Sequence, residues 1–162
     1  MVPDEDEYRA AAALLDRLRA RGLTLATAES CTGGLVAALI TAVPGASDVF
    51  GYGVVTYAND AKTDLLGVPA ALIAAHGAVS EAVARAMAAG ALARAAAGVA
   101  LAITGIAGPG GGSAEKPVGL VWFGLARAGE MRARSRKFVG SRNEIRAAAT
   151  REAIIQLQDF LT

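Results

Sequence analysis

Residues 23–41 read LTLATAESCTGGLVAALIT, and this stretch indicates the class of fold. Residues 23–28 form a short apolar run that predicts a strand. The chain then passes through Thr32-Gly33-Gly34, where the glycines permit a tight turn, into an apolar segment that predicts a helix to about Thr41. A strand that leads directly into a helix is typical of α/β domains.

Helical and extended patterns alternate along the rest of the chain. From Ala11 onward, for example, apolar residues recur at the i, i+3, i+4, i+7 spacing of a buried helix face. This order predicts an α/β fold with a single three-layer α/β/α domain and a mixed, mostly parallel sheet. The other expected helices cover residues 8–21, 61–66, a segment from Pro69, 80–97 and 142–161, and the other expected strands cover 49–57, 99–104, 118–125 and 131–138.

Length and composition indicate one globular domain. The 162 residues suit one sizeable core, and 54% of them are hydrophobic against 19% charged. No apolar run reaches the roughly 18 residues that a membrane span needs. The start of the chain is acidic, unlike a secretory signal. We therefore expect a flexible acidic N-terminus over residues 1–7, one domain over residues 8–162, and a cytoplasmic protein with no membrane partner.

Two residue counts and the net charge exclude several kinds of site. Cys31 and His76 are the only cysteine and histidine, which excludes an intrachain disulfide, a cysteine-based zinc site and a multi-histidine metal site. We expect no metal and no cofactor. A net charge of +1 gives no overall nucleic-acid footprint, so no nucleic-acid partner is expected. Residues 127–151 nevertheless hold eight bases against two acids, and these form either a solvated face or, in part, a phosphate contact.

Three polar or glycine-rich segments follow predicted strands directly. They cover residues 29–34, 56–59 and 104–112. Ligands of open α/β sheets bind beyond the carboxyl ends of the strands. The sequence therefore predicts that these three segments meet at one site.

Ser30 lies in the first of these segments, just before a helix. A helix start offers free N–H groups and a positive dipole end, which hold a phosphate or stabilise an oxyanion. The backbone donors of Thr32, Gly33 and Gly34 are the candidates for this role. Alternatively, Ser30 or Thr32 only caps the helix. Cys31 is a rival nucleophile, but it has no histidine partner and we interpret it as a small packed residue.

Tyr57 and Lys62 belong to the second segment and the helix after it. A serine hydroxyl needs a base, and a lysine serves when burial or nearby cations lower its pKa. A tyrosine five residues earlier relays the proton or fixes the lysine if a turn brings both to one pocket. The alternative for Lys62 is a solvated helix lysine.

The third segment is a glycine-rich loop after a buried-type strand. Such a loop cradles a phosphate or wraps a flat ring, which makes Thr104, Gly105 and Gly108 candidate substrate contacts. A mobile loop is the alternative. Ser47 lies in a loop before a predicted strand, where a turn role is the default and a ligand contact is the second possibility.

Several of these motifs, in this order, resemble the CinA C-terminal domain family, the nicotinamide-nucleotide amidohydrolases. The likeness extends from about Tyr8 to Leu161. Its motifs are TAESCTGG at 27–34, GVVTYANDAK at 53–62, GAVSE at 77–81, TGIAGP at 104–109, KPVG at 116–119, and the pair Arg142 and Arg146.

The resemblance implies that the protein hydrolyses nicotinamide mononucleotide to nicotinate mononucleotide and ammonia, in a metal-independent α/β/α domain that forms a homodimer or higher homo-oligomer. It implies that Ser30 is the nucleophile and that Tyr57 and Lys62 activate it. It also implies substrate contacts by Ser47, Thr104 and Arg142.

Two features depart from the family pattern. Many relatives carry a further N-terminal domain that resembles molybdopterin-binding proteins, so we expect the metal-dependent ADP-ribose hydrolysis linked to that domain to be absent here. Most relatives have Gly-Asp-Arg where this chain has Gly140-Ser141-Arg142, which leaves the pairing of Arg142 open.

Three other functions fit parts of the sequence. The first is a non-catalytic nucleotide-binding module, which binds nucleotide but releases no ammonia. The second is an interaction module linked to competence or DNA damage, which the family's historical name suggests. The third is a serine amidase that acts on another carboxamide and does not need a phosphate on its substrate.

Overall fold

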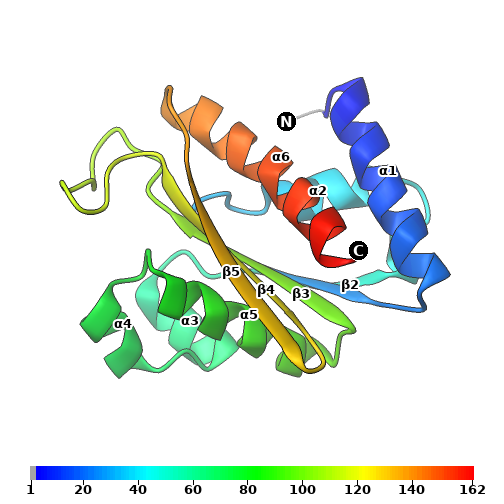
Figure 1. The fold of residues 1–162 in the computed structure, drawn as a ribbon, viewed down its shortest axis with the longest axis horizontal. Coiled ribbons are helices and arrows are strands. Elements are labelled where there is room, and N and C mark those ends of the chain that lie inside the picture. Colours follow the sequence, from blue (N-terminus) through cyan, green and yellow to red (C-terminus); the bar gives the residue numbers. More distant parts are fainter. Residues whose placement is uncertain (1–2) are drawn as a thin grey trace.

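Five strands run through the middle of the structure and form one mixed sheet in the order β2-β1-β3-β4-β5 (Figure 1). The computed structural model describes residues 3–162, so Met1 and Val2, at the start of the predicted acidic N-terminus, lie outside the described residues. The strands are β1 (Leu25–Glu29), β2 (Phe50–Val55), β3 (Val99–Gly105), β4 (Leu120–Arg127) and β5 (Glu130–Lys137).

The strand directions follow from the connections between the strands. β1 is parallel to β2 and to β3, and helices provide both crossovers. β4 is antiparallel to β3 and to β5, and a tight turn at residues 128–129 closes the β4–β5 hairpin. Four strands therefore point one way and β4 alone points the other, which confirms the mixed sheet.

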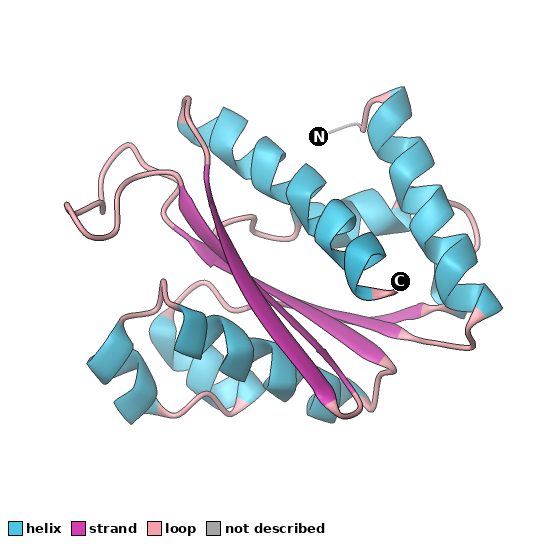
Figure 2. Cartoon of the chain, viewed as in Figure 1, coloured by secondary structure: helices cyan, strands magenta, loops and turns pink. Residues whose placement is uncertain are grey.

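Helices cover both faces of the sheet, so the predicted α/β/α layering is confirmed (Figure 2). α1 (Glu5–Ala20), α2 (Leu35–Thr41) and α6 (Arg142–Phe160) lie on one face, and α3 (Asn59–Leu66), α4 (Ala70–His76) and α5 (Glu81–Ala95) lie on the other. The connection after β1 thus leaves toward one face, whereas the connection after its neighbour β2 leaves toward the other. Such a divergence opens a crevice at the carboxyl ends of two adjacent strands.

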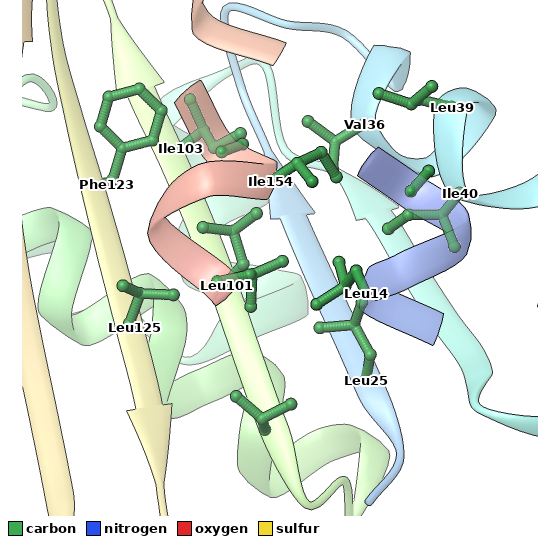
Figure 3. Packing of buried hydrophobic residues seen from close by; sticks show 14 of the residues in the cluster. Leu14, Leu25, Val36, Leu39, Ile40, Leu101, Ile103, Phe123, Leu125 and Ile154 are labelled. Atoms are coloured by element: carbon green, nitrogen blue, oxygen red, sulfur yellow. The ribbon is translucent and has the colours of Figure 1, made fainter. Parts of the chain in front are cut away.

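Large aliphatic side chains fill the space between the sheet and α1, α2 and α6 (Figure 3). Leu101 and Ile103 of β3 alternate with residues on the other face, and they pack in one cluster with Leu14 of α1 and Ile154 of α6. A strand presents every second side chain to the same face, so this alternation fixes the register of the sheet against the helices.

The opposite face of the sheet is lined by small side chains. Ala26, Ala28, Ala100 and Ala102 pack against α5 together with Ala88 and Ala91 of that helix. Small residues allow the helix axis to lie close to the sheet. The closest approach is at Gly124 of β4, where an added Cβ would lie 2.2 Å from the carbonyl oxygen of Ala84.

The first helix begins earlier than predicted, and the expectation of a flexible acidic lead is wrong for residues 4–7. The Asp4 carboxylate accepts the Glu7 N–H at 2.8 Å, and the Glu7 carboxylate accepts the Asp4 N–H at 3.1 Å. This reciprocal capping box places acids at the positive end of the helix dipole. Arg151 of α6 donates to Glu7 at 3.1 Å and ties the cap to the domain. The acidic residues are therefore the cap and first turn of α1.

The other predicted elements occur with ends shifted by a few residues. Ser80 caps α5, with its hydroxyl accepting the Val83 N–H. The helix predicted over residues 61–66 begins two residues earlier, at Asn59, and Ala58 takes its cap position. Between residues 3 and 162, no helix combines the length and apolar character that a membrane crossing requires.

We expect Gly124→Ala to lower the free energy of unfolding by about 1–3 kcal/mol, because the new methyl group must push α5 away from β4. Gly51→Ala is the matched control, since Gly51 also lies in a strand but an added Cβ meets nothing within 4 Å. Urea unfolding followed by circular dichroism measures both variants. Equal midpoints for the two would contradict the close approach of α5.

Candidate active site

The carboxyl ends of β1, β2 and β3 meet in one pocket of about 270 Å³. The prediction that the three polar segments converge is therefore confirmed. The start of α6 and the turn between α4 and α5 complete the walls. The lining residues are Ser30, Cys31, Tyr57, Asn59, Lys62, Ala78, Val79, Thr104, Gly105, Ile106, Ala107, Gly108, Gly110, Gly111 and Arg142.

Ser30 and Lys62 lie at the bottom of this pocket, side chain to side chain. The Ser30 N–H donates to the Ile103 carbonyl at 2.9 Å, so the sheet pairing continues up to the serine and holds it rigidly. Lys62 Nζ lies 3.3 Å from Ser30 Oγ. The serine comes from the end of β1 and the lysine from α3, on either side of the crevice between β1 and β2.

Lys62 is buried, and its pKa is lowered. Only 1% of the residue is exposed, so it is not the solvated helix lysine that was the alternative. Nζ donates to the carbonyls of Thr56 at 2.9 Å and Tyr57 at 3.2 Å. None of its three partners is a carboxylate, and desolvation lowers the Lys62 pKa from its usual 10.5. With Nζ bonded to two carbonyls and to Ser30 Oγ, the amine is placed to exchange a proton with the serine hydroxyl.

The phenol of Tyr57 is bonded to Arg142 rather than to the serine or the lysine. Arg142 donates to Tyr57 Oη at 2.6 Å and to the Gly108 carbonyl at 2.8 Å. In this structure the Tyr57 phenol contacts neither Ser30 nor Lys62, and its part in activating Ser30 stays a prediction. Tyr57 reaches Lys62 through its backbone carbonyl, while its half-exposed ring forms a wall of the pocket.

Arg142 reaches the pocket from the first turn of α6. Ser141 caps this helix: its hydroxyl accepts the Glu144 N–H, and the Glu144 carboxylate accepts from the Ser141 N–H and hydroxyl. These hydrogen bonds also lower the Glu144 pKa. Ser141 thus caps α6, a role that an aspartate at this position could also play. The Arg142 guanidinium is bonded to two neutral oxygens, Tyr57 Oη and the Gly108 carbonyl. Its positive charge is available to an anionic ligand.

The start of α2 does not offer its amides to a ligand. The buried Glu29 carboxylate accepts from the N–H groups of Gly34 at 3.0 Å, Val36 at 3.1 Å and Ala37 at 2.9 Å. The Gly33 N–H is bonded to a backbone carbonyl at 3.0 Å. The prediction that Gly33 and Gly34 donate to an oxyanion or a phosphate is therefore wrong, because an internal carboxylate already occupies that position.

Thr32 is buried and lies outside the pocket lining. Its carbonyl accepts from Arg146 at 3.0 Å, and the Cys31 carbonyl accepts from the same guanidinium at 3.1 Å. Neither Arg146 nor Glu29 was assigned a role from the sequence. The signals were present, since Arg146 lies one helical turn after Arg142 and Glu29 precedes the candidate nucleophile.

Cys31 lines the pocket beside Ser30 but is a poor nucleophile. The residue is 5% exposed, and burial raises the pKa of its thiol to about 11. The polar backbone of Cys31 and Thr32 opposes this rise in pKa without cancelling it. The interpretation of Cys31 as a packed residue agrees with its place in the apolar core cluster.

Thr104, Gly105 and Gly108 all line the pocket, as the strand-end rule predicted. The Thr104 hydroxyl donates to the Ala78 carbonyl at 2.9 Å and so ties β3 to the turn before α5. A Cβ at Gly105 would lie 3.0 Å from Cys31 Sγ, and one at Gly108 would lie 2.6 Å from a Val118 methyl. Close packing rather than free mobility therefore requires glycine at both positions.

Ser47 is not brought to this pocket. It lies in the short 3-10 helix Ala46–Asp48, which precedes β2, whereas Tyr57 follows β2. A six-residue strand spans about 20 Å, and Ser47 borders a separate depression with Thr24 and Arg94 at the opposite end of the sheet. Its predicted substrate contact has no support within one chain.

The charges of the pocket are unbalanced. Lys62 and Arg142 are its only charged lining residues, and no carboxylate is among them. Over residues 3–162, no group of three His, Cys, Asp or Glu side chains is placed to hold a metal ion. The arrangement suits an activated serine next to a site for an anionic group.

The sequence pattern described as the CinA C-terminal domain matches residues 7–161. The chain belongs to the CinA C-terminal domain family. It is 53% identical to a CinA-like protein of Geobacter sp. (strain M21), over 98% of this chain and 38% of that protein. A CinA-like protein of Mycolicibacterium gilvum is 57% identical over 87% of this chain and 34% of its own length. The chain spans little more than a third of the length of these two curated relatives.

Solved structures of CinA relatives have the same fold over their full length. The competence/damage inducible protein CihA from Agrobacterium tumefaciens is 44% identical, with a TM-score of 0.96 over 100% of this chain and 99% of that one. A competence-damaged protein (CinA) superfamily protein from Escherichia coli is 39% identical, with a TM-score of 0.93 over 99% and 94%. The CinA C-terminal domain thus occurs as a chain of this size.

We expect the Cys31 thiol of this CinA domain to react slowly with a disulfide reagent at pH 8 in the native state. A thiol with a pKa of about 11 is almost entirely protonated at that pH, and the thiolate is the reactive form. Labelling rates in buffer and in urea measure the difference. Equal rates in a folded and an unfolded sample would contradict the burial of Cys31.

Proposed function

We propose that this CinA domain hydrolyses the carboxamide of nicotinamide mononucleotide to nicotinate mononucleotide and ammonia, with Ser30 as nucleophile and Lys62 as its base. One observation carries the proposal: a buried lysine without a carboxylate partner lies 3.3 Å from a serine hydroxyl at the bottom of the pocket. Burial lowers the Lys62 pKa, so the amine is a proton acceptor at a lower pH than an ordinary lysine.

In the first half-reaction, Ser30 Oγ attacks the carboxamide carbon while Lys62 Nζ takes the hydroxyl proton. The protonated lysine then gives this proton to the amide nitrogen, the C–N bond breaks, and ammonia leaves a nicotinoyl ester on Ser30. In the second half-reaction, water attacks the ester and Lys62 takes a proton from the water. Lys62 returns that proton to Ser30 Oγ as nicotinate leaves.

The charge of the pocket supports a nucleotide rather than free nicotinamide. The phosphate of a mononucleotide carries roughly two negative charges at neutral pH. Arg142 is the exposed cation at the pocket and is held in place by Tyr57 Oη and the Gly108 carbonyl. We assign the phosphate to Arg142, and the pyridine ring to the walls formed by Tyr57, Thr104 and the glycine loop.

Ammonia release from nicotinamide mononucleotide by purified protein, with a chelator present, tests the proposal. We expect Ser30→Ala and Lys62→Met each to lose at least about a thousandfold in kcat, as nucleophile and base removal does in other serine hydrolases. Lys137→Met is the control, because Lys137 is exposed on β5 and is not among the lining residues. A turnover of Ser30→Ala above a tenth of the wild-type value would contradict the assignment of Ser30 as the nucleophile.

Two substrates without a phosphate distinguish the rival functions. Nicotinamide riboside and nicotinamide should be far poorer substrates, since neither offers Arg142 an anion. Equal turnover of all three would indicate an amidase for another carboxamide. Binding of the mononucleotide by a folded wild type without ammonia release would indicate a binding or interaction module.

The pH dependence of the reaction reports on Lys62. We expect kcat/KM to rise with pH along a limb whose midpoint lies below 10.5, because only the neutral amine accepts the serine proton and burial lowers its pKa. Initial rates between pH 5 and pH 10 measure the limb. A midpoint at or above the ordinary lysine value would exclude Lys62 as the base.

A further inference from the structure

Glu29 is a buried acid that the proposed reaction does not use. It directly precedes Ser30, is 1% exposed, and faces α2 with both carboxylate oxygens. Its three partners are backbone amides of the start of that helix, described above. A carboxylate that accepts several backbone N–H groups is held in one geometry, so Glu29 anchors the far end of the turn that follows the serine.

Arg146 holds the same turn from the other side. Its guanidinium donates to the carbonyls of Cys31 and Thr32 at 3.1 and 3.0 Å, from one turn into α6. Because the C=O and N–H of a trans peptide point in opposite directions, the bond to the Cys31 carbonyl turns the Thr32 N–H away from Arg146.

The hydrogen bonds of the turn leave the amides of Cys31 and Thr32 without an acceptor within residues 3–162. The Ser30 carbonyl accepts from Gly33, and the Ser30 N–H belongs to the sheet. The amides from Gly33 to Ala37 have acceptors within the turn and helix. Cys31 lines the pocket whereas Thr32 does not, and the Cys31 N–H points opposite to the Ser30 carbonyl of the same peptide, away from the interior of the turn.

We infer that Glu29 and Arg146 are positioning residues, which clamp the 30–34 turn so that the Cys31 amide receives the oxyanion formed when Ser30 attacks. The inference rests on the proposed function. It also moves the expected oxyanion donor from Thr32, Gly33 and Gly34 to Cys31, the residue that directly follows the serine. Preorganised backbone donors of this kind act on the transition state rather than on the bound substrate.

Glu29→Gln tests the carboxylate side of the clamp. The glutamine keeps one acceptor oxygen but turns an NH2 group toward the amides of α2. We expect kcat to fall about 10- to 100-fold while KM changes less than about threefold, as for the loss of an oxyanion donor. Glu7→Gln is the matched control, because Glu7 is another buried acid at a helix start and lies outside the pocket.

Arg146→Lys tests the other side and serves if Glu29→Gln fails to fold. Its single ammonium cannot span both carbonyls as the planar guanidinium does. We again expect a loss in kcat, with circular dichroism showing a folded protein. If Glu29→Gln and Arg146→Lys changed only KM, or had the same kcat as Glu7→Gln, the positioning role would be contradicted. Glu29 would then only cap α2.

A readout that needs no nucleotide separates this inference from the proposed function. A fluorophosphonate probe labels an activated serine through a transition state that also carries a negative oxygen. We expect labelling of Ser30 to slow by about the same factor as kcat in Glu29→Gln and not in Glu7→Gln. If labelling depends on Glu29 but the wild type releases no ammonia from nicotinamide mononucleotide, the positioning role of Glu29 is supported and the proposed substrate is contradicted. Labelling that is unaffected by both Glu29→Gln and Arg146→Lys overturns the clamp.

Discussion

The buried amine of Lys62 is the constraint on which the site depends. Removing an ammonium group from water without a counter-ion is costly, and a protein relieves that cost by lowering the pKa of the group. The carbonyls of Thr56 and Tyr57 take two protons of the amine and leave its third direction to Ser30. The position at which β2 ends matters for this reason, because these two carbonyls lie between the last residue of β2, Val55, and the Ala58 cap of α3.

The topology brings this amine to the serine. β1 and β2 are parallel neighbours whose following helices leave toward opposite faces, so the two chain segments diverge and leave a crevice between them. β3 adds Thr104 and the glycine loop on the other side of β1. The alanine-lined face lets α5 lie close to the sheet, and the Thr104 hydroxyl fastens the turn before α5 to the pocket through Ala78.

The strand ends could be predicted from the sequence, and with them most of the pocket. Short apolar runs located the strands, and the strand-end rule then collected Ser30, Tyr57 and Thr104 at one edge. The direction of individual backbone amides could not be predicted in this way. The sequence does not distinguish a helix start with free N–H groups from one whose N–H groups are bonded to a carboxylate such as that of Glu29. Only the folded chain shows that the N–H groups of Gly33 and Gly34 already have acceptors. Ser47 lies away from the pocket of its own chain, since a loop before a strand lies at the opposite end of the sheet from a loop after it.

The carboxylate of Glu29 has a consequence for how the turn behaves in different solutions. An empty helix start would attract sulfate, phosphate or chloride from the medium, and its geometry would vary with whichever ion was present. A covalently attached anion, buried to 1% exposure, is always at full occupancy and is hardly screened by salt. The geometry of the turn after Ser30 is thus independent of the ions in the medium. Arg142 at the pocket, in contrast, is able to bind anions from it.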